Sequence, residues 1–112
     1  MVICVPVTAE GLVDPRWGRA DRVAIAETAG DGIGSWQEFD VGWGTLHDAG
    51  TEGSHHARIA RLLRDHRVET VVAHHMGTPM VHMLQQMGLT VCLGATGDAR
   101  KAAIAAIEPE LS

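Results

Sequence analysis

Two pairs of adjacent histidines are the residues of this sequence whose types and spacing best suit chemistry. Seven histidines among 112 residues is a high count, and four of them fall in these pairs. Imidazole and thioether groups are donors for transition metals, whereas Mg²⁺ prefers clustered carboxylates. The candidate ligands are His55, His56, His74 and His75, and the second pair is followed by Met76 and Gly77.

Both pairs lie where a helix is expected to begin. The apolar run 71–73 ends just before His74, and Thr78 and Pro79 suit the N-cap and the first helical position. Ser54 precedes the other pair in the same way. Free backbone N–H groups and the positive end of the helix macrodipole favour an anion at such positions. The combination predicts an anionic ligand that contains metal, such as an iron–sulfur species.

The elements that must position these residues indicate a mixed α/β fold in the order β-β-β-α-β-α-β-α. Short apolar runs predict the strands, and Gly30-Asp31-Gly32 is a hairpin signal between the second and the third. We expect a glycine-rich connection over residues 42–53, before the first helix. The predicted strands are 2–7, 22–29, 35–41, 70–73 and 90–93, and the predicted helices are the one after Ser54, 79–87 and 98–107.

This order of elements predicts one five-stranded mixed sheet with helices packed on it. We expect the first three strands to form a meander and the last two to lie parallel beside the first strand. The loop after the first strand, which carries Trp17 and Arg19, then shares a rim with both histidine pairs. Ligands of open α/β sheets bind at such a rim, where the strand order changes direction.

Composition and charge exclude several classes of function. A formal net charge of −5 and a pI of about 5.7 give no electrostatic footprint for nucleic acid. The stripe of arginines from Arg58 to Arg67 is interpreted as a solvated helix face. Cys4 and Cys92 are too few for a disulfide framework and fit a reducing compartment. No apolar stretch approaches the ~20 residues of a membrane span. We therefore expect a single cytoplasmic domain over residues 1–112.

The loop after the first strand and the turn after the fourth resemble motifs of the dinitrogenase iron–molybdenum cofactor biosynthesis family. The run Val5-Pro6-Val7 precedes a loop that ends in Trp17-Gly18-Arg19-Ala20, and a His-Met-Gly junction follows at 75–77. The family's usual loop ending is similar to His-Phe-Gly-Arg-Ala. Here Arg16-Trp17 stands in place of His-Phe, so the aromatic ring is kept and a potential ligand is lost.

The histidine pairs occupy positions that matter in the same resemblance. His55 and His56 match a helix start at which the family often has a histidine. Gly77 matches the glycine that ends the family's Gly-x-Met-Gly turn, while His74 and His75 replace residues that are more commonly small. The additional imidazoles could strengthen a metal site or change its preference.

The resemblance implies a ribonuclease-H-like fold that binds or carries the iron–molybdenum cofactor or its iron–sulfur precursors. It implies metallocluster assembly proteins as partners, and we expect neither nucleic acid nor a membrane among the partners. We expect no enzymatic activity and no catalytic residue, and the sequence indicates no particular oligomeric state. The predicted cofactor-binding residues are Trp17, Gly18, Arg19, Met76 and Gly77, and the predicted metal ligands are His55, His56, His74 and His75.

Other interpretations are open at this stage. One is a ligand-free regulatory or protein-interaction domain on the same fold, because the histidine before Trp17 is missing and no cysteine is well placed. Another is a small metal-dependent hydrolase with three histidines and an open position, for which Glu52 and Asp48 are the nearest candidate bases. A ribonuclease-H-type nuclease is disfavoured, because the first strand offers a cysteine and no acid for the metal ions.

Overall fold

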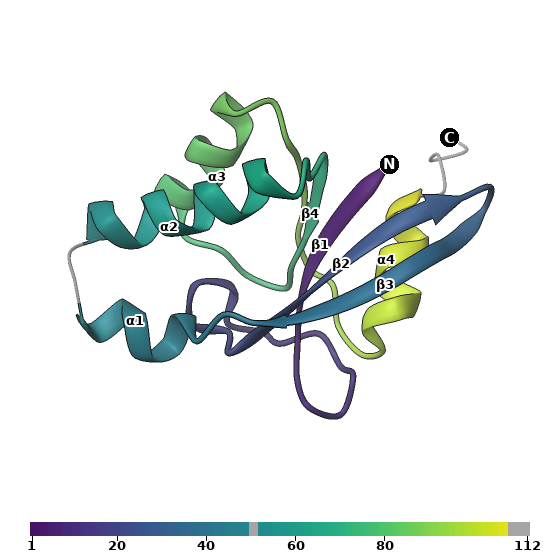
Figure 1. The fold of residues 1–112 in the computed structure, drawn as a ribbon, viewed down its shortest axis with the longest axis horizontal. Coiled ribbons are helices and arrows are strands. Elements are labelled where there is room, and N and C mark those ends of the chain that lie inside the picture. The colour runs from purple at the N-terminus through teal and green to yellow at the C-terminus, as the bar shows by residue number, and fades with distance from the viewer. Residues whose placement is uncertain (50–51, 108–112) are drawn as a thin grey trace.

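The sheet of this protein has five strands in the order β3-β2-β1-β4-β5 (Figure 1). The structure is a computed structural model that describes residues 1–49 and 52–107, apart from the side chains at 47–49 and 52. The strands are β1 (Val2–Val7), β2 (Arg22–Ala29), β3 (Gly32–Asp40), β4 (Thr70–Val72) and β5 (Thr90–Cys92). The helices are the 3₁₀ turn η1 (Trp17–Arg19), α1 (Trp43–Ala49), α2 (Glu52–Asp65), α3 (Thr78–Gln86) and α4 (Ala99–Ile107).

β1 lies at the centre of the sheet because both of its edges are paired. It runs antiparallel to β2, with Val7 opposite Arg22, and parallel to β4, with Ile3 opposite Thr70. β2 is antiparallel to β3, and β4 is parallel to β5. The predicted meander with two parallel strands added beside β1 is confirmed.

Helices cover both faces of the sheet (Figure 1). On one face, Ile59 of α2 and Leu84 of α3 belong to the same buried cluster as Cys4 of β1. On the other face, Ala103 of α4 belongs to the cluster that contains Val5 of β1. Burial on both faces explains why β1 is a continuous apolar run rather than an alternating one. The mixed α/β class predicted from the element order is confirmed.

α1 occupies a segment that was expected to be a glycine-rich connection. That expectation is wrong for residues 43–49, and for residues 52–53, which begin α2 (Glu52–Asp65), while residues 50–51 lie outside the described part. Trp43 is 1% exposed, and its ring packs edge-on against Trp17 with the ring centroids 5.1 Å apart. A Cβ added to Gly44 would lie 2.9 Å from the carbonyl oxygen of Arg19, so glycine permits this close approach. Tertiary packing therefore forms this short helix against its low propensity.

The remaining boundaries differ from the predicted ones by a few residues at most. β3 begins at Gly32, because the turn after β2 needs only two residues and Gly30 takes the left-handed region at φ 62°. Gly77 is the N-cap of α3, with no side-chain cap hydrogen bond, so the prediction of Thr78 as N-cap is wrong. Gly88 follows α3 with φ 82°, which confirms the predicted helix end.

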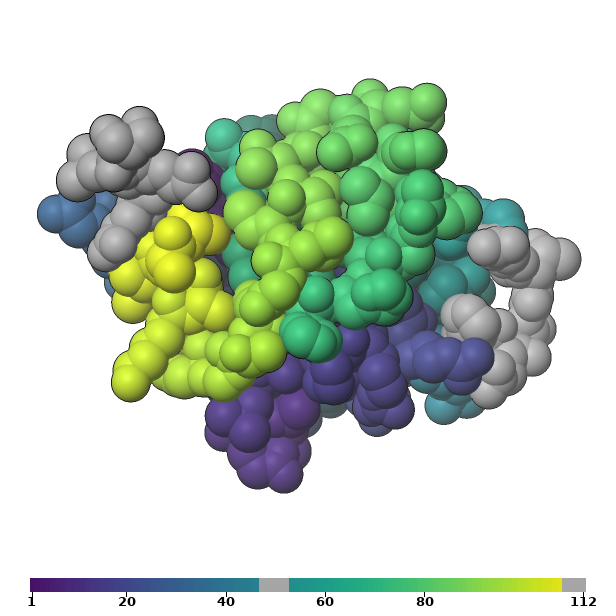
Figure 2. Space-filling view, turned by 180° about the vertical axis from the view of Figure 1, so that it is seen from behind, coloured from purple at the N-terminus to yellow at the C-terminus, as the bar shows by residue number. Residues whose placement is uncertain are grey.

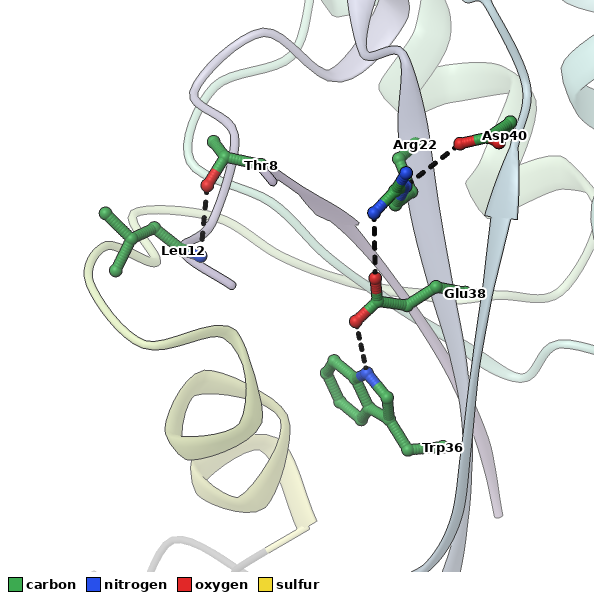
Figure 3. A network of polar contacts seen from close by, with 6 residues as sticks. All are labelled: Thr8, Leu12, Arg22, Trp36, Glu38 and Asp40. Carbon is green, nitrogen blue, oxygen red and sulfur yellow. Dashed lines mark hydrogen bonds and ion pairs between the residues drawn. The ribbon is translucent and has the colours of Figure 1, made fainter. Parts of the chain in front are cut away.

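A polar network joins β2 to the edge strand β3 (Figure 3). Arg22 donates through Nε to Asp40 at 2.9 Å and through Nη1 to Glu38 at 3.4 Å. The indole nitrogen of Trp36 donates to Glu38 at 2.9 Å, and the Arg100 guanidinium of α4 lies 4.7 Å from the Trp36 ring centroid. Because these groups are largely exposed, we assign them a modest structural role.

Within the described ranges, none of the helices combines the length and the apolar character that a membrane span requires.

Candidate functional site

The loop that follows β1 and the turn that follows β4 enclose a pocket of about 310 Å³. Its walls are residues 15–19, His56 from α2, residues 75–77, and Pro79 and Met80 from the first turn of α3. Figure 2 shows the blue-purple loop meeting the green chain that follows β4 at the molecular surface. Seven of the nine predicted site residues line this pocket, and the two that do not are His55 and His74.

Trp17 forms the inner wall of the pocket as part of η1. Its side chain is 2% exposed, and its ring is held by Trp43 of α1. Among the described residues its indole Nε1–H has no hydrogen-bond partner, although the atom is buried. Such a donor costs ~1–3 kcal/mol when it is left unsatisfied. Trp17 therefore lines the pocket from a buried position and is supported by the core.

Arg16 enters the pocket wall in an orientation fixed by a buried carboxylate. Asp14 is 4% exposed and accepts hydrogen bonds from the backbone N–H of Arg16 at 2.9 Å and from its Nε at 3.3 Å. This bonding raises the pKa of Arg16, so the guanidinium stays charged. The backbone of Arg16 also forms a parallel bridge with His75, which joins the two walls. Sequence reasoning did not assign Arg16 to the site, although an aspartate two residues earlier is a local signal for this arrangement.

The turn after β4 separates its two histidines. His75 lines the pocket, whereas the backbone carbonyl of the preceding His74 accepts a hydrogen bond from Gly94 at 2.9 Å and its side chain is exposed elsewhere. Met76 and Met80 are 6% and 5% exposed and bring two thioethers to the same wall. The spacing of Met80 along its helix predicts a core residue, and Met80 is indeed buried, but it also lines the pocket.

His55 lies behind the pocket wall and contacts backbone. It is 3% exposed, and its Nε2 lies 2.7 Å from the carbonyl oxygen of Gly18. Its Nδ1 lies 3.5 Å from Nη1 of Arg58, one turn further along α2. Because a carbonyl can only accept, Nε2 carries the proton and donates. The neighbouring His56 faces the pocket instead, so the two histidines of this pair have different surroundings.

The lining of the pocket favours an anion. Arg16 and Arg19 both line it, the guanidinium of Arg16 paired with Asp14 just outside the lining, and none of the described residues that line it is acidic. α3 begins at this wall, and its N-cap Gly77 supplies no side-chain acceptor for the free N–H groups of the first turn. An anion that enters the pocket would therefore meet arginine donors on the wall formed by residues 15–19 and the start of α3 on the other wall.

The described side chains show no preformed set of ligands for a bare metal ion. The structure, in the part of the chain that it describes, contains no group of three His, Cys, Asp or Glu side chains that could hold an ion. The side chains of Glu52 and Asp48, the bases that a hydrolase would need, lie outside the described part. The two histidines that line the pocket are His56 and His75.

Cys4 is expected to resist thiol reagents in the folded protein. It is fully buried, and desolvation raises the pKa of its thiol, so the reactive thiolate does not form at neutral pH. Alkylation followed by mass spectrometry should modify Cys4 only after unfolding, with the half-buried Cys92 as internal comparison. Rapid alkylation of Cys4 in the native protein would contradict this packing. Neither cysteine lines the pocket.

The fold and the pocket together define a small mixed α/β domain with an anion-compatible site at the rim of its sheet. The sequence matches the family described as dinitrogenase iron-molybdenum cofactor over residues 1–109, and the chain belongs to this family. The resemblance inferred from residues 5–20 and 75–77 is thereby confirmed. No curated protein matches the sequence significantly.

Several solved structures share the fold, and three of them illustrate the likeness. The crystal structure of PH0822 has a TM-score of 0.77 at 16% identity and covers 96% of this chain and 88% of that one. The apo form of the orange protein from Desulfovibrio gigas has a TM-score of 0.73 at 22% identity, with 91% and 82% covered. TM1290 from Thermotoga, described as a member of the DUF35 family, has a TM-score of 0.68 at 20% identity, with 93% and 84% covered. At these identities the likeness establishes the fold alone.

Proposed function

We propose that this protein binds and carries an anionic metal–sulfur cluster of the iron–sulfur or iron–molybdenum type during cofactor assembly, without enzymatic activity. One observation carries the proposal: the pocket combines two guanidinium groups, two imidazoles and two thioethers with no acidic side chain among its described lining residues. Membership of a family named for the iron–molybdenum cofactor supports the same ligand class.

Some pocket residues would balance the charge of the cluster, and others would coordinate its metal atoms. Arg16 and Arg19, with the N–H groups at the start of α3, would balance the charge of the sulfides through charge-assisted hydrogen bonds. His56 or His75 would supply an imidazole to a metal atom at the surface of the cluster. The thioethers of Met76 and Met80 would form the apolar, polarisable part of the wall.

A carrier role agrees with the openness of this arrangement. The pocket lies at the surface, where His75 and Arg19 are exposed, so cargo could pass to a partner without unfolding of the wall. The partners would be metallocluster assembly proteins. We also assign the five-stranded sheet to the ribonuclease-H-like group, as the family resemblance implies.

Cluster binding in the pocket is tested by replacing each of the two adjacent histidines in the turn after β4. The purified protein is reconstituted anaerobically with iron and sulfide, and bound metal and the visible absorption spectrum are recorded. Wild type is expected to show charge-transfer bands, and His75→Ala is expected to lower the metal content and alter the bands. His74→Ala is the matched control, because this side chain does not line the pocket, and it should behave as wild type.

Two results would contradict the proposal. If wild type takes up neither iron nor sulfide, the ligand-free interaction domain becomes the better account of the fold. If His74→Ala and His75→Ala lose the cluster equally, the cluster does not bind in this pocket.

A further inference from the structure

The wall of the pocket formed by η1 is held from behind by two helices. Trp43 of α1 packs against Trp17, and Gly44 of α1 lies directly under the carbonyl oxygen of Arg19. His55 of α2 donates to the carbonyl oxygen of Gly18. Each of the three residues of η1 therefore has its own contact from α1 or α2.

His55 makes the polar contact of this set. Its ring is nearly fully buried, and the 2.7 Å separation from the Gly18 oxygen lies at the short end of the range for N–H···O hydrogen bonds. The Arg58 guanidinium at 3.5 Å from Nδ1 favours the tautomer that keeps the proton on Nε2. The contact with Arg58 at Nδ1 thus orients the ring, and the ring donates through Nε2 to the loop at Gly18.

We propose that His55 is a positioning residue that fixes the Gly18 peptide, and with it the side chains of Trp17 and Arg19 in the pocket wall, and that it is not a metal ligand. This assignment changes the role predicted for His55 from its pairing with His56. The effect of His55 on cluster binding rests on the proposed function, whereas its effect on the structure of η1 does not. Replacement of the donor should therefore loosen η1 even in the ligand-free protein.

The first test is amide hydrogen exchange of the ligand-free protein, followed by NMR. The amides of Arg19 and Ala20 donate to the carbonyls of Arg16 and Trp17 within this turn. In His55→Leu we expect these two amides to exchange roughly tenfold faster relative to the β1 amides, as for loss of one buried hydrogen bond. His55→Gln, which keeps a donor at a similar reach, should restore most of the protection.

The second test separates positioning from coordination. Binding of tetrathiomolybdate, a coloured metal–sulfur anion, is titrated with wild type, His55→Leu and His55→Gln. Positioning predicts roughly tenfold weaker binding for the leucine variant and near wild-type binding for the glutamine variant. The pair His82→Leu and His82→Gln, at an exposed position of α3 outside the pocket, is the matched control and should change nothing.

Three outcomes decide the proposal. Unchanged exchange of Arg19 and Ala20 in His55→Leu would overturn it, whatever the binding data show. Equal loss of binding in the leucine and glutamine variants would overturn it in favour of an imidazole ligand. If wild type binds no thiometallate, the proposed function fails, while faster exchange in His55→Leu alone would still support the positioning role.

Discussion

Replacement of both Arg16 and Arg19 by glutamine is expected to weaken the binding of an anionic metal–sulfur cluster by roughly 100-fold or more. Both guanidinium groups line the pocket, and Asp14 holds one of them in place. A hydrogen bond to a charged group contributes ~1.5–3 kcal/mol, so the loss of two such bonds has this magnitude. Titration with tetrathiomolybdate measures the change directly.

A matched control removes the same charge from a different surface. Arg61 and Arg64 of α2 are exposed and lie outside the pocket, so the double glutamine variant there should bind almost as wild type does. The affinity of wild type should also fall as salt is raised, because exposed charges are screened. Equal weakening by both double variants would show that net charge, and not this pocket, governs binding.

Trp43→Ala is expected to lower the free energy of unfolding by about 3–5 kcal/mol, the usual cost of truncating a buried large aromatic side chain. Trp43 is 1% exposed, and its truncation leaves a cavity beside Trp17. Because Trp17 is part of the pocket wall, the variant should also bind cluster poorly. Urea unfolding followed by circular dichroism gives the stability change.

Trp36→Ala is the control for a tryptophan that is not in the core. Trp36 is half-buried and contacts Arg100 through a cation–π interaction, which is worth only ~0.5–1 kcal/mol at such a position. A cost for Trp43→Ala no greater than that for Trp36→Ala would mean that α1 does not hold η1 in the way described.

The topology of the sheet was predictable because β1 has a distinctive sequence. A short continuous apolar run must be covered on both faces, which indicates a strand in the middle of a sheet. Its proline lies near the strand end, where the missing N–H group costs little pairing. The glycine near the β2–β3 turn fixes the hairpin. α1 was not predictable, because the four glycines of residues 42–53 argue against a helix there, and its stability comes from the packing of Trp43 on a loop that is distant in sequence.

The candidate site was predictable in outline but not in its division of roles. Adjacent histidines look alike in sequence, yet neighbouring positions of a helix point in different directions. His55 is therefore buried in the core, while His56 faces the pocket. In the same way His75 lines the pocket and His74 does not. Which member of a pair faces inward depends on helix rotation and turn geometry, which local sequence does not determine. Arg16 was missed because its orientation depends on the burial of Asp14.

The most direct measurement is an NMR titration of ¹⁵N-labelled protein with tetrathiomolybdate under anaerobic conditions. If the pocket binds the metal–sulfur anion, the largest amide shifts will fall on residues 16–19, 75–78 and 80, and the indole signal of Trp17 will move with them. Saturating shifts confined to those segments would support the account. Shifts spread along the exposed arginines of α2, or no shifts at millimolar anion, would contradict it.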